Sequence, residues 1–353
     1  MLKYYWKRGD IMLSFESDYI IGAHEKVLEA LCKTNNEVLS GYGNDIHTKR
    51  AEELIKNACC SSESEVFFLT GGTQANAVVI STMLRNFEGV ISAKTGHIAL
   101  HEVGAIEFTG HKVIELDGLE GKLPSGTLES YLEAFYGDEN NSMMVRPAMV
   151  YISHPTEDGT LYSKSELTKL REICDKYEMK LFLDGARLGY GLMSEGTDVT
   201  LPLLAKLCDA FYIGGTKVGA MFGEAVVITN PALLKNFMPL VKQHGALLAK
   251  GRLLGLQFEA LFTDNLYERI ACETVGRAMR LRDIFNAAGY PVVVDSPTNQ
   301  QFFTLPNTLI DKLKEEASFE IWGPRGESES TVRFVTGWST TDEDIETLKD
   351  LMA

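Results

Sequence analysis

Residues 181–189 read Leu-Phe-Leu-Asp-Gly-Ala-Arg-Leu-Gly, and residues 211–220 read Phe-Tyr-Ile-Gly-Gly-Thr-Lys-Val-Gly-Ala. Each stretch begins with a short apolar run, which is typical of a strand buried on both faces. Just past the predicted strand, each carries one ionisable side chain, Asp184 in the first and Lys217 in the second. Because ligands collect at the carboxyl edge of a parallel sheet, the two stretches predict a fold and a site together.

The same alternation of strand and helix patterns extends along most of the chain. Further strand-like runs cover residues 66–69, 89–93, 112–116, 148–152 and 225–229. Helical patterns lie at 24–33, 163–177, 201–207 and 231–241. This order predicts an α/β fold with a mostly parallel central sheet that helices cover on both faces.

The regular alternation of predicted strands and helices ends at about residue 245. Two long helices are expected at 247–263 and 273–288, followed by strands at 292–294, 301–304 and 331–335 and a last helix that begins after Thr341. We therefore expect a large domain over residues 14–246 and a smaller C-terminal α+β domain over residues 247–353. Residues 1–13 are expected to form an extension that packs on the small domain.

Composition narrows the possible partners. The 353 residues are 45% hydrophobic and 24% charged, with 34 Lys and Arg against 49 Asp and Glu, a formal charge of −15. A chain this acidic repels phosphate backbones and anionic lipids, so nucleic acid and membrane surfaces are poor partners. No apolar run approaches the roughly 18 residues of a membrane-spanning helix. The six cysteines show no CxxC pair and no metal spacing, so we expect reduced thiols, a cytoplasmic location and no metal site.

A glycine-rich turn follows the first strong strand signal. Residues 70–76 read Thr-Gly-Gly-Thr-Gln-Ala-Asn, between a buried strand and a helical pattern. Exposed N–H groups at a helix start attract a phosphate, and Thr73 adds a hydroxyl donor. Such turns also serve simple chain reversal, and this one has neither the dinucleotide nor the P-loop fingerprint.

Asp184 and Lys217 are each open to two interpretations. The carboxylate of Asp184 needs a partner, which is either the nearby Arg187 or a protonated ring nitrogen of a cofactor. Lys217 either reaches solvent from a loop or is a desolvated amine with a lowered pKa, which makes a competent nucleophile. A phosphate turn, a strand-end Asp and a strand-end Lys together are the set of groups that pyridoxal 5'-phosphate (PLP) needs.

The sequence resembles the threonine aldolases of the β-eliminating lyase group, which have the aspartate-aminotransferase (type I) fold. The resemblance runs from about Ser14 to the C-terminus with order and spacing kept. The matching motifs are F-E-S-D-Y (15–19), G-Y-G-N-D (41–45), G-G-T-Q-A-N (71–76), G-H-I-A-L-H-E-V-G-A (96–105), D-G-A-R-L (184–188), T-K-V-G-A (216–220) and V-R-F-V-T (332–336).

This resemblance implies roles around the cofactor. Lys217 would attach PLP covalently, Asp184 would pair with the ring nitrogen, and His97 would stack on the ring. The other cofactor-binding residues that it implies are Gly72, Thr73, Arg187 and Thr216, with Gly72 and Thr73 on the phosphate.

The resemblance also implies how a substrate is held. Ser17, Arg187 and Arg333 would bind its α-carboxylate, because an arginine fork matches a carboxylate with two hydrogen bonds. Tyr42 and Lys250 would reach the active site of a neighbouring subunit, in a homodimer or a homotetramer.

The sequence leaves several candidates for the residue that carries the proton at the substrate hydroxyl. His97 is implied for this role, with His101 as a competitor. Residues 152–160, Ile-Ser-His-Pro-Thr-Glu-Asp-Gly-Thr, fall where family members have an Asn-Thr-His stretch, so His154 or Thr156 is a further candidate.

Two other positions depart from the family pattern. Glu16 replaces the usual arginine, and Asn44 stands where an acidic residue is usual.

The expected activity is retro-aldol cleavage of a β-hydroxy-α-amino acid, such as L-threonine or L-allo-threonine, to glycine and an aldehyde. Fold alone does not decide the reaction, so a PLP-dependent β-elimination, racemase or aminotransferase activity is the alternative. A binding protein that keeps the fold without the chemistry is a third possibility. The expected partner is a small amino acid, with no nucleic acid and no membrane.

Overall fold

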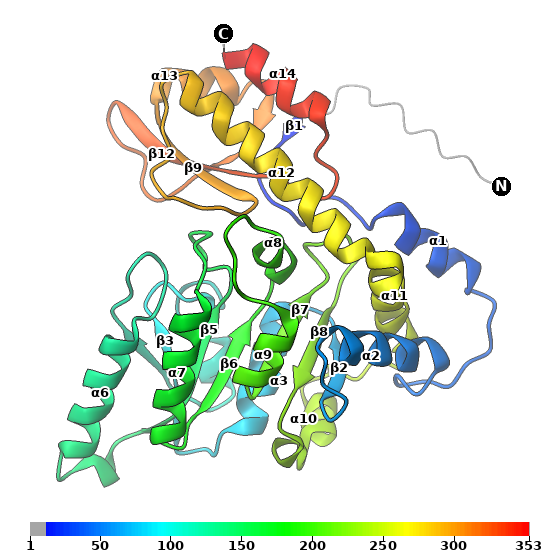
Figure 1. Ribbon diagram of the computed structural model, residues 1–353, viewed down its shortest axis with the longest axis vertical. Coiled ribbons are helices and arrows are strands. Elements are labelled where there is room, and N and C mark those ends of the chain that lie inside the picture. Colours follow the sequence, from blue (N-terminus) through cyan, green and yellow to red (C-terminus); the bar gives the residue numbers. More distant parts are fainter. Residues whose placement is uncertain (1–11, 353) are drawn as a thin grey trace.

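A seven-stranded sheet forms the centre of the larger domain in the computed structural model, which describes residues 12–352 (Figure 1). In spatial order its strands are β2 (Glu65–Leu69), β8 (Glu224–Ile228), β7 (Ala210–Gly214), β6 (Lys180–Asp184), β5 (Arg146–Ser153), β3 (Glu88–Ala93) and β4 (Val113–Leu116). Strands β3 to β7 run parallel, whereas β8 is antiparallel to both of its neighbours. The predicted α/β fold with a mostly parallel sheet is confirmed.

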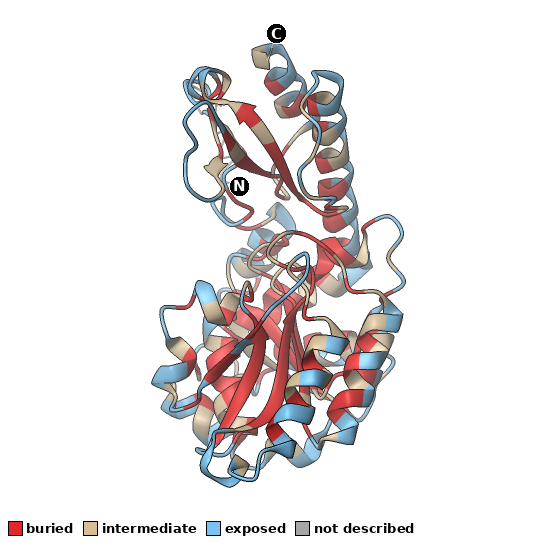
Figure 2. Cartoon of the chain, turned by 90° about the vertical axis from the view of Figure 1, so that its left-hand side faces the viewer, coloured by how far each residue is buried: buried red, intermediate tan, exposed pale blue. Residues whose placement is uncertain are grey.

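Two apolar layers bury the faces of this sheet. Alternate residues of β6 enter opposite layers, since Leu181 and Leu183 belong to one core and Phe182 to the other. The first core includes side chains of α2 (Ile46–Ala58), α6 (Ser125–Gly137), α7 (Lys164–Lys176) and α9 (Leu201–Leu207). The second includes those of α3 (Gly72–Met83), α4 (His97–Leu100), α5 (Ala105–Phe108) and α10 (Phe237–Gln243). Figure 2 shows the result, a buried sheet inside helices whose outer faces are exposed.

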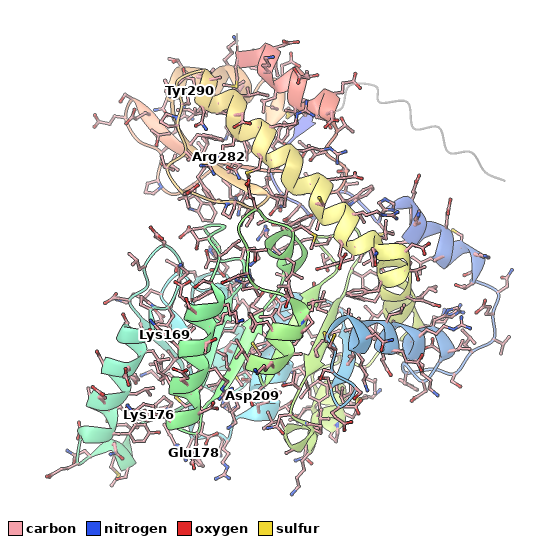
Figure 3. All side chains as sticks on the ribbon, viewed as in Figure 1. Lys169, Lys176, Glu178, Asp209, Arg282 and Tyr290 are labelled. Carbon is pink, nitrogen blue, oxygen red and sulfur yellow. The ribbon has the colours of Figure 1, made fainter. Side chains whose placement is uncertain are left out.

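Helix α7 illustrates how sequence fixes such an element. Ser163 and Glu166 form a reciprocal capping box at its start, which satisfies backbone N–H groups that have no helical partner. Leu167, Leu170, Ile173 and Cys174 are buried at helical spacing. Lys169 and Lys176 lie along the exposed part of the helix (Figure 3).

The smaller domain contains a three-stranded antiparallel sheet. Its strands are β9 (Gln300–Pro306), β12 (Glu329–Val335) and β11 (Glu320–Ile321), with β12 in the middle. The second half of α12 (Leu266–Ala287), α13 (Asn307–Leu313) and α14 (Asp342–Met352) cover it. Leu13, the last residue of the expected extension, forms β1 (Leu13–Ser14) with Ser14, and β1 pairs with β10 (Ala317–Ser318) of this domain; residues 1–11 of the extension lie outside the described part.

Helix α12 joins the two domains. Leu266 and Ile270 near its start pack in the large-domain core, and Leu281 and Phe285 near its end pack in the small-domain core. Helix α11 (Arg252–Phe262) packs against α1 (Glu25–Lys33) and α2, with Phe258 and Leu261 in the large-domain core. The large-domain core therefore continues past residue 247, through α11 and the first half of α12.

Some expected elements differ in extent. The helix expected at 231–241 is divided into a 3-10 turn (Pro231–Leu234) and α10, because Asn236 adopts a left-handed φ of 98°. The helix expected at 273–288 begins earlier, at Leu266, and the strand expected at 292–294 is a single bridge from Val292 to Phe303. None of the helices in residues 12–352 is both long and apolar enough to cross a membrane.

Candidate active site

Asp184, the last residue of β6, accepts hydrogen bonds on both carboxylate oxygens. Oδ1 accepts from the Tyr212 hydroxyl and from the backbone N–H of Ala186 (3.0 Å). Oδ2 accepts from the Tyr151 hydroxyl (2.6 Å) and from Nδ2 of Asn76 (3.0 Å). Four donors around one buried carboxylate stabilise its ionised form. Arg187, considered above as its partner, forms its ion pair with a different residue.

His97 opens the short helix α4 and points one ring nitrogen at an acid. Its Nδ1 lies 2.8 Å from Oε1 of Glu102, which also accepts from Nδ2 of Asn76 at 2.8 Å. Burial lowers the pKa of His97, but the hydrogen bond with Glu102 and the charges of Asp184 and Glu102 outweigh burial and raise it. Burial raises the pKa of Asp184, but the charge of His97 and the donors around the carboxylate leave it below its usual value. The structure therefore favours a cationic His97 beside an ionised Asp184.

Lys217 lies in the turn after β7 with a half-buried amine. Its Nζ is 5.7 Å from the ring centre of Tyr19, and the Tyr190 hydroxyl holds its backbone carbonyl at 2.5 Å. Burial, and then the positive charge of Arg187, lower the pKa of Lys217 to about 8. A sizeable fraction of the amine is then neutral near neutral pH, which makes it a competent nucleophile.

Glu224 is a buried acid beside Lys217 that sequence reasoning missed. It pairs with Gly214 across β7 and β8, so its side chain lies under the turn that carries the lysine. Its Oε1 accepts from Oγ1 of Thr216 (2.8 Å) and its Oε2 from the N–H of Gly215 (3.0 Å), while burial raises its pKa to about 8. The Thr216 hydroxyl, expected on the cofactor, thus already donates to Glu224. Glu224 is the single acid at the start of the otherwise apolar strand β8, and this pattern was the sequence feature that could have identified it as a site residue.

The start of α3 offers free backbone donors. The first helical hydrogen bond runs from the N–H of Ala75 to the carbonyl of Gly71, so the N–H groups of Gly72, Thr73 and Gln74 precede the intrahelical ladder. A Cβ built on Gly71 would meet no atom within 4 Å, so the space in front of this helix start is open. These groups suit a phosphate, as the sequence predicts.

Arg187 is held by Asp18. The Nε of Arg187 lies 2.7 Å from Oδ2 of Asp18 and its Nη2 lies 3.0 Å from Oδ1, a two-point contact. Asn299 adds a hydrogen bond of 2.9 Å to the same carboxylate. Burial raises the pKa of Asp18, but the charges of Arg187 and Lys217 outweigh it and lower the pKa. Asp18, which sequence reasoning did not single out, orients the arginine.

Arg333 and Ser17 present donors without partners. The Nη1 of Arg333 donates to Oε1 of Gln300 (2.9 Å) and its Nη2 to Glu320, and its Cζ lies 4.6 Å from the ring centre of Trp322. Its buried Nε and the buried Oγ of Ser17 have no partner among residues 12–352. Burial and the nearby charge of Arg187 lower the pKa of Arg333. Two neighbouring guanidinium groups with unused donors suit an anion.

The remaining histidine candidates differ in position. The ring of His101 lies 5.6 Å from that of His97, so both face the same region. His154 is fully buried, its Nδ1 accepts from the N–H of Tyr162 (3.3 Å), and burial lowers its pKa to about 4. It is therefore neutral near neutral pH. Oγ1 of Thr156 is bonded within its own loop, 2.7 Å from Oγ1 of Thr160.

Tyr42 and Lys250 lie together elsewhere on the large domain. The N–H of Tyr42 donates to the carbonyl of Ala249 (3.1 Å), and Nζ of Lys242 lies 5.1 Å from its ring centre. Both Tyr42 and Lys250 are exposed. They are not in contact with the strand-end residues of their own chain.

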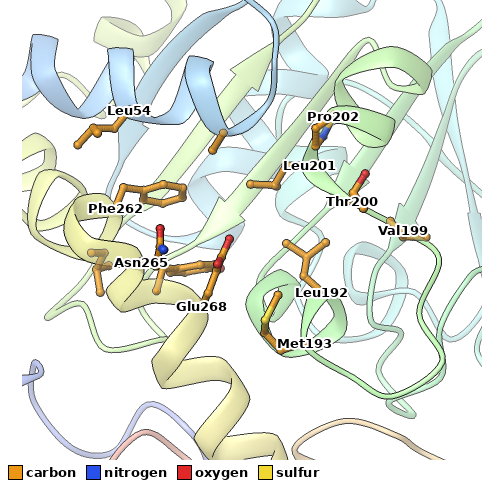
Figure 4. A pocket seen from close by; sticks show the side chains of 13 residues that line it. Leu54, Leu192, Met193, Val199, Thr200, Leu201, Pro202, Phe262, Asn265 and Glu268 are labelled. Carbon is orange, nitrogen blue, oxygen red and sulfur yellow. The ribbon is translucent and has the colours of Figure 1, made fainter.

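A separate cavity of about 420 Å³ lies between α2, α9, α11 and α12 (Figure 4). Its lining is mostly apolar and includes Leu54, Leu192, Leu201 and Phe262. None of the strand-end residues described above lines it. The candidate active-site residues therefore lie in the polar cluster at the sheet edge and not in this cavity, to whose lining α8 (Leu188–Leu192) contributes only its last residue, Leu192.

The sequence and the structure are both similar to those of known proteins. Residues 15–304 match the sequence model of the family described as β-eliminating lyase. The chain is 28% identical over 335 residues, 93% of each chain, to a low specificity L-threonine aldolase of a Pseudomonas species. A solved structure of Leishmania major threonine aldolase superimposes with a TM-score of 0.92 at 41% identity, covering 96% of this chain and 99% of that one. A Thermus thermophilus aspartate aminotransferase, 15% identical with a TM-score of 0.69, covers 97% of this chain and 91% of that one and shows the likeness of fold alone.

Proposed function

The chain belongs to the β-eliminating lyase family and within it to the threonine aldolases, and we propose that it is a PLP-dependent lyase that cleaves L-threonine or L-allo-threonine to glycine and an aldehyde. One observation carries the proposal: a lysine of lowered pKa, an aspartate of lowered pKa and two neighbouring arginines, one of them with an unused buried donor among residues 12–352, meet at one edge of the sheet. A cofactor-dependent amino-acid site needs each of these groups.

The residues present fit PLP. The ionised Asp184 suits a protonated ring nitrogen, Lys217 suits an aldehyde carbon, and the open space before Gly71 suits a phosphate at the start of α3. His97 would lie against the ring. When bound, PLP supplies an electron-accepting ring for the charge left on the substrate's Cα.

The two arginines and Ser17 would hold the substrate carboxylate. The Nε of Arg333 and the Oγ of Ser17 are buried donors that have no partner in the part of the chain that the structure describes, which is costly unless a ligand satisfies them. Arg187 adds positive charge near Arg333 and is fixed in place by Asp18. Such anchoring fixes the orientation of the bonds at Cα relative to the cofactor ring, and that orientation determines which of these bonds breaks.

His97 would act on the substrate hydroxyl as a hydrogen-bond donor. The hydrogen bond with Glu102 and the charge of Asp184 raise its pKa, which favours the protonated ring, and a protonated ring can stabilise negative charge on the hydroxyl oxygen. Because Nδ1 of His97 is already paired with Glu102, we seek the proton acceptor among other groups.

We also propose a homo-oligomer in the cytoplasm. Tyr42 and the segment around Lys250 lie side by side at the surface, away from the site of their own chain, where a second copy could use them. The six cysteines carry no disulfide in the described residues, which suits a reducing compartment. Sedimentation of the purified protein distinguishes monomer, dimer and tetramer.

The function is tested with purified protein and added PLP. Incubation with L-threonine and with L-allo-threonine is expected to release acetaldehyde and glycine in equal amounts. Lys217→Ala is expected to abolish turnover, whereas Lys176→Ala, at an exposed lysine paired with Glu129, is expected to leave it unchanged. Pyruvate, inverted substrate or a keto acid as the product would instead identify elimination, racemisation or transamination. Cofactor binding without turnover of any amino acid would identify a binding protein.

A further inference from the structure

Glu157 is a half-buried acid that none of the roles above uses. It lies in the loop after β5, four residues past Ser153, whose hydroxyl contacts its Oε1 at 2.6 Å. Its Oε2 is buried and has no partner among the residues that the structure describes. An unsatisfied buried carboxyl oxygen costs free energy unless it is protonated or contacts a ligand. This oxygen is therefore available to a bound molecule.

Contacts with its neighbours place Glu157 between the two halves of the site. Ser153 pairs with Asp184 across β5 and β6, so one side of Glu157 faces the region of the cofactor ring. On the other side, Nε2 of Gln300 donates to the backbone carbonyl of Glu157 (3.4 Å) and Oε1 of the same glutamine accepts from Arg333 (2.9 Å). The acid thus stands between the ring site and the carboxylate site, where the substituent on Cβ of an amino acid would lie.

The charges around Glu157 set its proton affinity. The titratable groups that face it are Asp184, His97, Tyr151 and Tyr162. Burial and the charge of Asp184 raise its pKa, the Ser153 hydroxyl and His97 lower it, and the balance is about 7. A general base works best with a pKa near the working pH, because it is then both available and basic enough.

On the premise of the proposed aldolase function, we propose that Glu157 is the residue that accepts the proton of the substrate's β-hydroxyl. Nδ1 of His97 is paired with Glu102. The ring of His154 packs beside Tyr162 (ring centres 6.4 Å apart) in the core layer on the opposite face of the sheet from Tyr151, so its Nε2, which has no partner in the described chain, does not face the ring site. Ser153 is a positioning residue, which holds the carboxylate through its hydroxyl.

The proposed step balances. The substrate O–H bond breaks and an O–H bond forms on Glu157, while the electron pair freed on the oxygen becomes the aldehyde C=O. The Cα–Cβ bond breaks with its electron pair remaining at Cα. Cα later gains one proton and Glu157 returns one to solvent, so the net reaction moves a single proton from oxygen to carbon.

The test compares Glu157→Gln, which keeps the shape of the side chain but cannot take a proton, with the parent holoenzyme. Turnover of L-threonine and L-allo-threonine is expected to fall by about 10²-fold or more, with the limb of the kcat/KM profile near pH 7 lost. Glu157→Asp is expected to recover part of the rate. Asp158→Asn, the same chemical change one residue further on, is the control and is expected to retain both the rate and the limb.

A measurement without turnover separates this role from simple misfolding. Glycine has no hydroxyl, so its dissociation constant, read from the cofactor absorbance, is expected to change less than about threefold in Glu157→Gln. The carboxyl infrared band that titrates near pH 7 in the parent and disappears in Glu157→Gln belongs to Glu157, whereas the band of Glu224, which titrates near pH 8, is expected to remain in that variant. A variant that keeps the rate and the limb, or a parent without the band, would overturn the assignment to Glu157. If the parent itself releases no aldehyde, the aldolase proposal fails first, and the infrared band still tests the carboxyl.

Discussion

Asp18 and Arg187 form a two-point ion pair although 169 residues separate them in the chain. The pair ties the segment after β1 to the turn after β6. It also fixes the guanidinium whose positive charge lowers the pKa of Lys217 more than any other charge does. Because Asp18 occupies Nε and Nη2, only the remaining edge of the fork is left to a ligand. Arg187 is thus positioned before any substrate arrives, which lowers the entropy lost on binding.

The first prediction concerns this pair. Asp18→Ala leaves a buried guanidinium without its counter-charge, so the free energy of unfolding is expected to fall by about 3–5 kcal/mol. Urea denaturation of the apoprotein measures it. Asp18→Asn still offers one acceptor and is expected to lose less. Equal stability of the Ala variant and the parent would show that the pair does not hold this segment.

A second prediction separates two adjacent glycines at the start of α3. A Cβ on Gly71 meets no protein atom within 4 Å, and the residue has an extended φ of −174°, so Gly71→Ala is expected to fold normally. Its methyl group would enter the space expected for the phosphate, so PLP affinity is expected to fall by about tenfold or more, roughly the 1.4 kcal/mol that one lost contact with an anion represents.

Gly72→Ala gives the contrasting result. Its Cβ would lie 2.8 Å from the Tyr212 hydroxyl, which would have to move away from Asp184. We expect this variant to lose stability even without cofactor. Thermal denaturation of both apoproteins, followed by titration with PLP, gives the comparison. Loss of stability in the Gly71 variant would mean that the space is not open.

The third prediction concerns Glu224 and pH. Its folded pKa of about 8 lies above the usual 4.5, so the native state holds a proton that the unfolded chain releases in this interval. Stability from this group is therefore fully present below pH 4.5 and declines as the pH rises toward 8. Lys217 acts in the opposite sense at higher pH, since its folded pKa of about 8 lies below the usual 10.5 and its contribution improves from pH 8 upward.

Glu224→Gln isolates the acid's part. The variant is expected to show a shallower decline of unfolding free energy between pH 5 and pH 8 than the parent, measured by urea denaturation at each pH. Glu65→Gln, at an exposed strand residue, is the control. Parallel curves for the parent and the Glu224 variant would refute the raised pKa.

The sequence could predict what is local and could not predict what folding brings together. Asp184 is the last residue of an apolar strand and Lys217 lies three residues past another, so a pattern of a few residues finds them. Glu224 enters the site only because β8 runs antiparallel beside β7, a pairing that strand patterns do not specify. Asp18 meets Arg187, and Asn299 meets Asp18, across long sequence distances.

Side-chain directions in loops could not be predicted from the sequence either. Residues 152–160 have no helical or strand period, so nothing in the pattern tells which of His154, Thr156 and Glu157 faces the site. The structure shows that His154 is buried against Tyr162 and that Thr156 is bonded within the loop. Within residues 12–352, both Oε2 of Glu157 and Nε2 of His154 lack a partner, but the ring of His154 packs beside Tyr162, whereas Glu157 is bonded to Ser153 at the sheet edge.

The last prediction concerns the charge on His97. Because Glu102 contacts Nδ1 of His97 at 2.8 Å, replacing it by glutamine removes the contribution that raises the imidazole's pKa most. In Glu102→Gln, burial is then less strongly opposed, so the pKa of His97 is expected to fall toward or below the ordinary 6.5. NMR titration of the imidazole carbons measures this directly. The loss of charge also weakens the support for Asp184, so its pKa is expected to rise in the same variant. Glu107→Gln, an exposed acid on α5, is the matched control, and an unchanged His97 titration in Glu102→Gln would show that the cation is held by Asp184 alone.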